Sequence, residues 1–222
     1  MIRRLTSMLV LFSLLAGIIP TFASAAEFDD WIIRSPLPTS NSLSDVTYGN
    51  GTYVAVGTNG TIVTSIDGEN WTTHTSGTER TLVDVAYGNG TFVTVGQAGT
   101  VLTSSDGELW INRDPGTMMD LYDITYVDGT FVAVGLGGTI LFSSDGVNWT
   151  SRTSGTATSI NAIDYGNGAY VAVGNAGLIV TSNDGVNWTS RTGATQELNG
   201  VAYGSGTFVV VGIDGQIATS ND

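Results

Sequence analysis

Four aspartates recur in a repeated segment, and clustered carboxylates are the side chains of this sequence best suited to bind a cation. Asp45, Asp84 and Asp123 stand 39 residues apart, and Asp164 lies two positions further along in the fourth copy. On an inner strand of each repeat, alternation of side chains would direct all four to equivalent sides. Two interpretations follow: a calcium site, or acceptors for main-chain N–H groups of the neighbouring repeat. No spacing matches a calcium loop, which favours the second and predicts no metal.

Basic side chains recur at a second position. Arg34, Arg113, Arg152 and Arg191 each lie three residues after a Trp, and His74 takes that place in the remaining copy. An arginine cluster can clamp a carboxylate. These positions fall on the outermost strand of each repeat, which keeps them apart, so we expect local ion pairs instead. With one His in the chain, a Ser–His–Asp set is not expected, whereas two carboxylates for glycoside hydrolysis stay open.

Composition excludes several partners and cofactors. The sequence has no Cys and one His, which leaves no zinc or copper ligand set and no disulfide. No cofactor is expected. After residue 25 the chain keeps five of its seven basic residues and all twenty acidic residues, a formal net charge of −15. Such a surface repels phosphate, so nucleic acid and anionic lipid are not expected as partners.

Residues 1–25 have the pattern of an export signal. Arg3 and Arg4 precede an apolar stretch from Met8 to Ile19, and Ala23-Ser24-Ala25 is the small-x-small pattern of a cleavage site. We expect the mature chain to begin at Ala26. No second apolar stretch of spanning length follows, so no membrane insertion is expected after cleavage. The predicted location is secreted, extracellular or at the cell surface.

The remaining residues, 26–222, read as five copies of a unit of about 39 residues. In the second copy, four short β-rich segments are separated by Gly-Asn-Gly, a Gly-bounded turn and Asp-Gly, which are hairpin signals. We predict strands at Leu82–Tyr87, Thr91–Val95, Thr100–Ser104 and Trp110–Arg113. Four-stranded units repeated at this period predict an all-β fold, a β-propeller of four-stranded blades.

Unpaired segments at the two ends of the repeat array suggest how the ring closes. Trp31–Arg34 has the pattern of a fourth strand, and Gln216–Ser220 that of a third strand. Placed side by side, they would complete a fifth blade, and closure would remove exposed sheet edges. We therefore expect five blades closed by the N-terminal strand. The alternative is a fragment of a longer propeller.

A seven-residue motif, Ser-x-Asp-Gly-x-x-Trp, recurs in register four times. It resembles the Asp-box, or BNR repeat, of sialidases, sortilin-type receptors and photosystem assembly factors, although the usual box has one more residue between Asp and Trp. The resemblance implies a structural role: Asp accepts turn N–H groups, and Trp packs between blades. The amino-acid sequence of the repeats is also similar to that of repeats in secreted bacterial surface proteins. The box residues are Ser65, Asp67, Trp71, Ser104, Asp106, Trp110, Ser143, Asp145, Trp149, Ser182, Asp184 and Trp188.

Function is predicted from what varies between the copies. The Arg-Ile-Pro motif of sialidases and any non-repeating insertion are absent from the sequence, so no catalytic residue is assigned. We expect a non-enzymatic module that binds a glycan or a protein. The alternatives are a glycoside-processing enzyme of the Asp-box superfamily and, by likeness to the photosystem factors, an assembly scaffold. The turns between second and third strands and the links between blades differ from copy to copy, as contacts with an asymmetric ligand require. The candidate ligand residues are Arg80, Gln97, Met118, Met119, Asp120, Leu136, Asn175 and Asp214.

Overall fold

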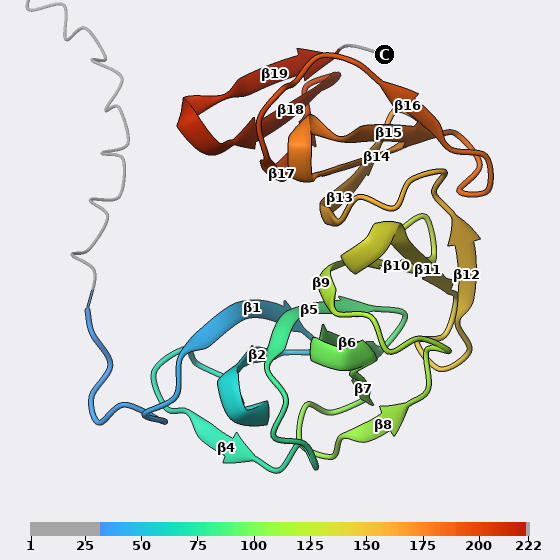
Figure 1. Ribbon diagram of the computed structural model, residues 1–222. Coiled ribbons are helices and arrows are strands. Elements are labelled where there is room, and N and C mark those ends of the chain that lie inside the picture. The colour runs from blue at the N-terminus through green and yellow to red at the C-terminus, as the bar shows by residue number, and fades with distance from the viewer. Residues whose placement is uncertain (1–31, 221–222) are drawn as a thin grey trace, which may run out of the picture. The chain divides into compact units, whose positions relative to one another are not determined.

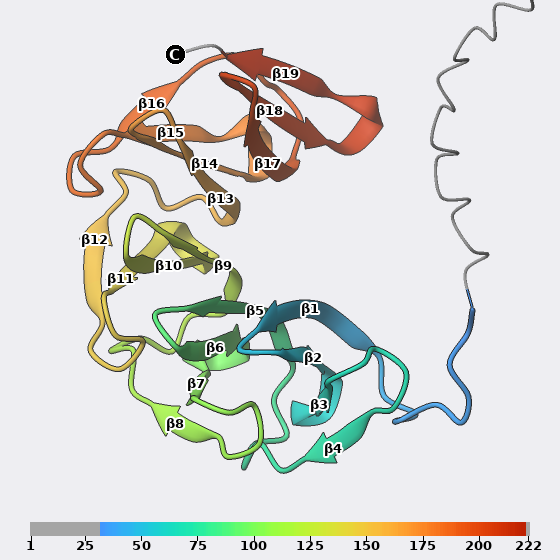
Figure 2. The same ribbon diagram turned by 180° about the vertical axis from the view of Figure 1, so that it is seen from behind.

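The computed structural model describes residues 32–220, which form five antiparallel sheets that follow one another along the chain. Four sheets have four strands and the fifth has three. Figures 1 and 2 show the strands of each sheet side by side in chain order. The expected signal segment and Trp31 lie outside the described residues. Within residues 32–220, no helix is long and apolar enough to span a membrane.

We number the sheets as blades along the chain. The first blade contains β1–β4, the second β5–β8, the third β9–β12, the fourth β13–β16 and the fifth β17–β19. The strands are β1 (Leu43–Gly49), β2 (Thr52–Gly57), β3 (Ile62–Ser65), β4 (Thr72–His74), β5 (Leu82–Gly88), β6 (Thr91–Gly96), β7 (Val101–Ser104), β8 (Ile111–Arg113), β9 (Leu121–Val127), β10 (Thr130–Gly135), β11 (Thr139–Ser143), β12 (Thr150–Thr153), β13 (Ile160–Gly166), β14 (Ala169–Gly174), β15 (Ile179–Ser182), β16 (Thr189–Arg191), β17 (Leu198–Gly204), β18 (Thr207–Gly212) and β19 (Ile217–Ser220).

The turn residues determine the register of each blade. In the second blade, Asn89 and Gly90 have φ of 48° and 74°, as a tight two-residue hairpin requires, and Gly88 pairs with Thr91 across it. A short 3₁₀ turn joins the second strand of each blade to the third. These turns are Thr58–Gly60, Gln97–Gly99, Leu136–Gly138, Asn175–Gly177 and Ile213–Gly215.

The apolar core is divided among the interfaces between consecutive blades. One cluster joins Val54 and Ile62 of the first blade to Leu82, Leu102 and Trp110 of the second. Equivalent clusters join the second blade to the third, the third to the fourth and the fourth to the fifth. Since each blade's apolar surface is covered by its neighbours, the blades stabilise one another in series.

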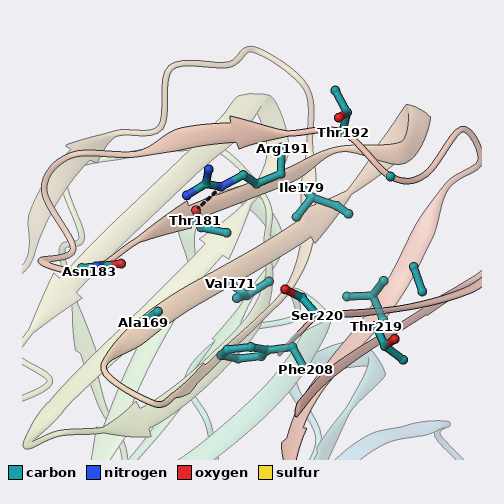
Figure 3. A pocket seen from close by; sticks show the side chains of 13 residues that line it. Ala169, Val171, Ile179, Thr181, Asn183, Arg191, Thr192, Phe208, Thr219 and Ser220 are labelled. Carbon is teal, nitrogen blue, oxygen red and sulfur yellow. Dashed lines mark hydrogen bonds between the residues drawn. The ribbon is translucent and has the colours of Figure 1, made fainter. Parts of the chain in front are cut away.

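The N-terminal end differs from the expectation of a closing strand. Ile32–Arg34, the described part of that segment, forms no strand, and the fifth sheet has three strands. Arg34 instead forms an ion pair with Glu69 of the first blade, with Nη2 and Oε1 3.0 Å apart. Beside β19 lies a cavity of about 470 Å³ between the fourth and fifth blades (Figure 3). Ring closure therefore stays a prediction.

Candidate functional site

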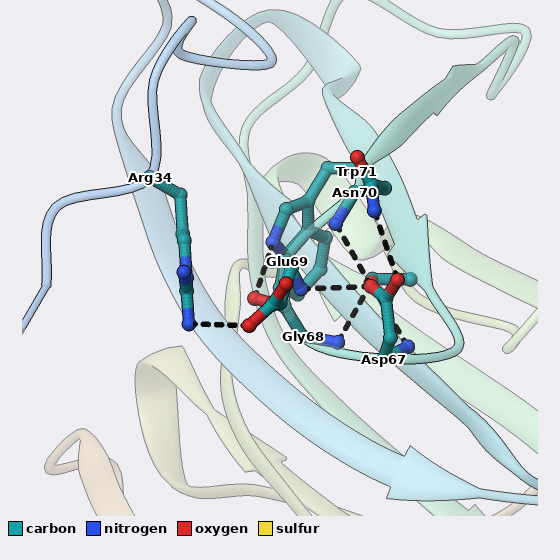
Figure 4. A network of polar contacts seen from close by, with 7 residues as sticks. Arg34, Asp67, Gly68, Glu69, Asn70 and Trp71 are labelled. Carbon is teal, nitrogen blue, oxygen red and sulfur yellow. Dashed lines mark hydrogen bonds and ion pairs between the residues drawn. The ribbon is translucent and has the colours of Figure 1, made fainter. Parts of the chain in front are cut away.

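The four Ser-x-Asp-Gly-x-x-Trp turns share one hydrogen-bonding pattern. In the third blade, the N–H groups of Val147 and Asn148 both donate to Asp145 Oδ1 at 2.8 Å. Ser143 Oγ accepts the N–H of Gly146 at 2.8 Å, and Trp149 Nε1 donates to the Gly146 carbonyl at 3.0 Å. Figure 4 shows the same network around Asp67 in the first blade. As expected from the sequence, these aspartates accept hydrogen bonds from the main-chain N–H groups of their own turns.

Main-chain donors also shift the titration of these carboxyls. Hydrogen bonds from the Asn148 N–H and side chain hold the pKa of Asp145 well below its usual range, and Asn70 and Asn187 do the same for Asp67 and Asp184. The pKa of Asp106 is also lowered, by the Leu109 and Glu108 N–H groups. These carboxylates are ionised acceptors committed to their own turns, which fits a structural role.

The second turn lacks one hydrogen bond that the other three make. Asn148 Nδ2 donates to Asp145 Oδ2 at 2.8 Å, but Leu109 occupies this position in the second blade and is 71% exposed. Replacing Leu109 with Asn should therefore stabilise the protein by about 0.5 kcal/mol, a modest gain because the site is solvated. Asn148→Leu should cost a similar amount. Thermal unfolding of both variants checks this, and a destabilised Leu109→Asn protein would contradict it.

The tryptophans pack as expected where a preceding blade is present. Trp110, Trp149 and Trp188 each join the cluster between their own blade and the one before it. Trp71 belongs to the first blade, and its ring lies 6.4 Å from that of Tyr53 in the same blade. Trp110, Trp149 and Trp188 are therefore interface residues, whereas Trp71 contacts a ring of its own blade.

The recurring aspartates of the first strands bridge consecutive blades. Asp45 Oδ2 accepts the N–H of Val85 at 3.1 Å, and Asp84 Oδ2 accepts that of Ile124 at 2.7 Å. The same contact joins Asp123 to Ile163 at 2.7 Å and Asp164 to Tyr203 at 2.7 Å. The interpretation of these residues as acceptors for the neighbouring repeat is confirmed. We call them the strap aspartates.

Three strap aspartates also contact one another. Burial, together with hydrogen bonding and repulsion between the carboxyls of Asp45 and Asp84, raises the pKa of Asp45 to about 7. Burial and the Asp123 carboxyl raise the pKa of Asp84 to about 7, and burial raises that of Asp123. An open cavity of about 500 Å³ adjoins these carboxyls. Among residues 32–220, no group of three or more acidic or His side chains is arranged to hold a metal ion.

The outer-strand basic residues stay apart, but most make contacts other than the expected ion pairs. Arg113 Nε donates to Thr103 Oγ1 at 2.9 Å, and Arg191 Nε donates to Thr181 Oγ1 at 2.9 Å. In the third blade Phe142 replaces this Thr, and the Arg152 guanidinium lies 5.8 Å from the ring centre. Arg34 alone within residues 32–220 forms an ion pair. The expectation of local ion pairs was therefore wrong for these three, whose side chains meet a hydroxyl or a ring on the neighbouring strand instead.

Six of the eight candidate ligand residues come together around two 3₁₀ turns. Asp120 Oδ1 accepts the Ala98 N–H at 2.6 Å, and the Asp120 carbonyl accepts the Leu136 N–H at 2.8 Å. The link that carries Met118 and Met119 is thus attached to Gln97–Gly99 on one side and Leu136–Gly138 on the other. We call this region the variable face; its residues are Arg80, Gln97, Met118, Met119, Asp120 and Leu136.

The variable face exposes apolar side chains beside charged ones. Met118 is 74% exposed, and Met119 and Leu136 are also exposed. Arg80 Nη1 reaches the Ala98 carbonyl at 3.5 Å, and Gln97 Oε1 accepts the Thr81 N–H at 3.3 Å. Exposed methionines with an adjacent guanidinium suit contact with another protein.

The other two candidates lie on later blades. Asn175 is in the 3₁₀ turn of the fourth blade, where its Oδ1 accepts from Asn161 Nδ2 at 2.9 Å. Asp214 is exposed in the 3₁₀ turn of the fifth blade. Sequence reasoning did not identify the close approach of the strap carboxyls, which helps to raise their pKa values, or the cavity beside β19. The sequence signal that could have revealed this approach of the carboxyls was the constant spacing of 39 residues between Asp45, Asp84 and Asp123.

Known structures share this fold. YCF48 from Cyanidioschyzon merolae superposes with a TM-score of 0.65 and 18% identity, over 82% of this chain and 67% of that chain. The structure of YCF48 bound to a D1 peptide superposes with a TM-score of 0.68 and 20% sequence identity, over 88% of this chain and 68% of that chain. The WD40 β-propeller domain of Doa1 superposes with a TM-score of 0.64 and 13% sequence identity, over 81% of this chain and 64% of that chain. No protein-family model and no curated protein matches the sequence. The likenesses establish the fold, an all-β propeller of four-stranded blades.

Proposed function

We propose that this chain is a secreted, non-enzymatic propeller that binds a protein at the cell surface through the variable face. The observation that carries the proposal is the exposed pair Met118 and Met119, held between two 3₁₀ turns and flanked by Arg80. Exposed apolar side chains of this kind, rimmed by polar groups, favour a partner over solvent. The opposite end of each blade repeats nearly unchanged and supplies turn geometry.

The chemistry of the face indicates the kind of partner. A formal net charge of −13 for the whole sequence favours partner segments with basic residues around an apolar contact. A propeller of similar fold, YCF48, has been seen bound to a D1 peptide, which supports a peptide segment as the ligand. We therefore favour an extended, basic and apolar peptide over a glycan.

The enzymatic alternative receives less support from the positions of the carboxyls. The box aspartates accept main-chain N–H groups of their own turns, and the strap aspartates accept those of the next blade. A glycoside hydrolase needs two carboxyls free to face a substrate. We propose that the carboxyls of both sets are structural, and that the Ser-x-Asp-Gly-x-x-Trp turns are shortened Asp-boxes.

A random peptide library displayed on phage provides the test. Peptides selected on the wild-type protein should lose at least about tenfold in affinity for a Met118→Ser/Met119→Ser double variant, since two apolar contacts become polar. Arg80→Glu should lower affinity for peptides without basic residues more than for basic ones. Binding is measured by biolayer interferometry at one fixed salt concentration.

Leu109→Ser is the matched control, because Leu109 is 71% exposed and Met118 is 74% exposed. Leu109 lies in a box turn at the opposite end of its blade, so this variant should bind the selected peptides like the wild type. Loss of binding in Leu109→Ser, with the methionine variant unaffected, would refute the assignment. A glycan-array signal from the wild type that the methionine variant keeps would favour a glycan site elsewhere.

A further inference from the structure

The sulfur atoms that follow residue 25 all lie on the variable face. The sequence contains four methionines and no cysteine; Met1 and Met8 belong to the expected signal, and the other two are Met118 and Met119. Both lie in the link between β8 and β9 (Figure 1). Met118 is 74% exposed and Met119 is 47% exposed. A dissolved oxidant therefore reaches both thioethers without any opening of the fold.

The fold does not need a thioether at either position. Every link makes the same main-chain hydrogen bond, in which the residue before a first strand accepts an N–H of the 3₁₀ turn of that blade at 2.8 to 3.1 Å. The other links nevertheless carry charged, small or polar pairs where this link carries methionines. These pairs are Glu79-Arg80, Ala157-Thr158 and Thr195-Gln196. A polar group at positions 118 and 119 is therefore compatible with the fold.

The link that carries the methionines is held by groups that oxidation leaves unchanged. Asp120 Oδ1 accepts the Ala98 N–H at 2.6 Å, and Thr117 Oγ1 accepts the N–H of Met119 at 3.1 Å. The main chain of the link lies against Gly99, where an added Cβ would clash with the Thr117 carbonyl oxygen. None of these contacts uses a methionine side chain, so the link should keep its conformation when the sulfur atoms are modified.

We propose that Met118 and Met119 form an oxidation switch that turns off partner binding at the variable face, an inference that rests on the function proposed above. The oxidant is a peroxide. One peroxide oxygen bonds to the methionine sulfur as the O–O bond breaks; the sulfur loses two electrons, and hydrogen peroxide leaves as water. The apolar thioether becomes a polar sulfoxide, so the apolar contact with the partner is lost. A thiol-dependent methionine sulfoxide reductase reverses the step: two thiols become a disulfide, and the oxygen leaves as water.

Oxidation changes the polarity of the face but not its charge. Arg80 and Asp120 keep their charges, and charged groups mainly govern the rate of association. The lost apolar contact should therefore appear as faster dissociation of the bound peptide, with little change in the association rate.

Peroxide treatment of the mature protein under native conditions tests the switch. Intact-mass spectrometry and peptide mapping should show two added oxygen atoms, with Met118 oxidised before the less exposed Met119. Affinity for the peptides selected on the untreated protein should fall at least about tenfold, mainly through faster dissociation. The midpoint of thermal unfolding should move by less than about 2 °C, because changes at exposed positions barely affect stability. The two stereospecific sulfoxide reductases, supplied with a thiol, should restore binding.

Met118→Leu/Met119→Leu is the matched control, because leucine keeps the apolar volume and carries no sulfur. This variant should bind the selected peptides about as well as the wild type and should lose no affinity after peroxide. An equal loss in this variant would place the effect at another residue, such as a tryptophan, and would overturn the switch.

Three further outcomes also decide the matter. Methionines that stay reduced, or an oxidised wild type that keeps its affinity, overturn the switch and leave the proposed function standing. A loss of affinity accompanied by a markedly lower unfolding temperature overturns it too, since the methionines would then support the fold. If Met118→Ser/Met119→Ser binds like the wild type, the proposed function fails, and the switch fails with it.

Discussion

Replacing Gly135 with alanine should destabilise the protein by at least about 3 kcal/mol, since the added Cβ meets main-chain atoms that cannot move aside. Gly135 has φ of −178°, an ordinary extended conformation, so the cost is steric. An added Cβ would lie 2.0 Å from the Asp120 carbonyl oxygen and 2.9 Å from Leu121 Cα. The Asp120 carbonyl is itself fixed by the Leu136 N–H, 2.8 Å away.

Gly116→Ala separates this steric effect from the loss of a glycine as such. Gly116 has φ of 74° and open space around an added Cβ. Its replacement should cost only about 1 kcal/mol, from the positive φ. Urea unfolding of both variants gives the two free energies. Equal losses of unfolding free energy would mean that the link before β9 can move away from the 3₁₀ turn. The variable face would then be less rigid than its hydrogen bonds to the two turns imply.

The protein should be more stable at about pH 5 than at pH 8, although its surface is strongly acidic. Asp45 and Asp84 have pKa values raised to about 7, so the folded protein keeps protons that the unfolded chain releases above about pH 4. Stability from these groups is complete below about pH 4 and is lost as the pH rises to about 7. Each extra proton held contributes a slope of at most about 1.4 kcal/mol per pH unit, less for the partly solvated Asp45.

The box aspartates act in the opposite direction at lower pH. Their pKa values are lowered, so their contribution is present above about pH 4 and falls as the pH drops below it. The two sets together place the maximum of stability near pH 4 to 5. Thermal unfolding across pH 3 to 9 measures this curve, and a maximum at or above pH 7 would contradict the raised pKa values of Asp45 and Asp84.

Asp84→Asn isolates the strap contribution. The asparagine carbonyl can still accept the Ile124 N–H, and its amide can donate to a neighbouring carboxylate as the protonated acid does. The variant should therefore unfold at a higher temperature than the wild type at pH 8 and show a flatter pH dependence. Asp128→Asn, at an exposed hairpin turn, is the control and should follow the wild-type curve.

The strands were predictable because hairpin chemistry is local. Gly-Asn-Gly and Asp-Gly fix the turns, and the predicted strands Leu82–Tyr87 and Thr91–Val95 each fall one residue short of β5 and β6. Trp110 was predicted inside the fourth strand but precedes β8, because its indole bonds to Gly107 in the turn. Local signals therefore placed the strands of the second blade to within one residue at each end, whereas the strand predicted at Trp31–Arg34 is not formed in its described part, Ile32–Arg34.

Contacts between blades were harder to predict. The direction of the strap aspartates followed from alternation, but their raised pKa values depend on burial and on how closely neighbouring carboxyls approach, which no sequence pattern encodes. Likewise, Arg113 was expected to pair with an acid, whereas its partner is Thr103 on the adjacent strand. The gathering of Met118, Arg80 and Leu136 followed from comparing copies, because turns at one end of a meander share a face. What they bind depends on a partner outside this sequence.

The strap aspartates have a consequence for how such a chain can evolve. Each carboxylate accepts from a main-chain amide, and the side chains of the donors Val85, Ile124, Ile163 and Tyr203 take no part in the hydrogen bond. A junction therefore requires an Asp from one copy only, and any residue except proline can supply the donor in the next. Duplication, deletion or recombination of whole copies would keep the junctions intact. The loops between the junctions are then free to mutate independently in each copy.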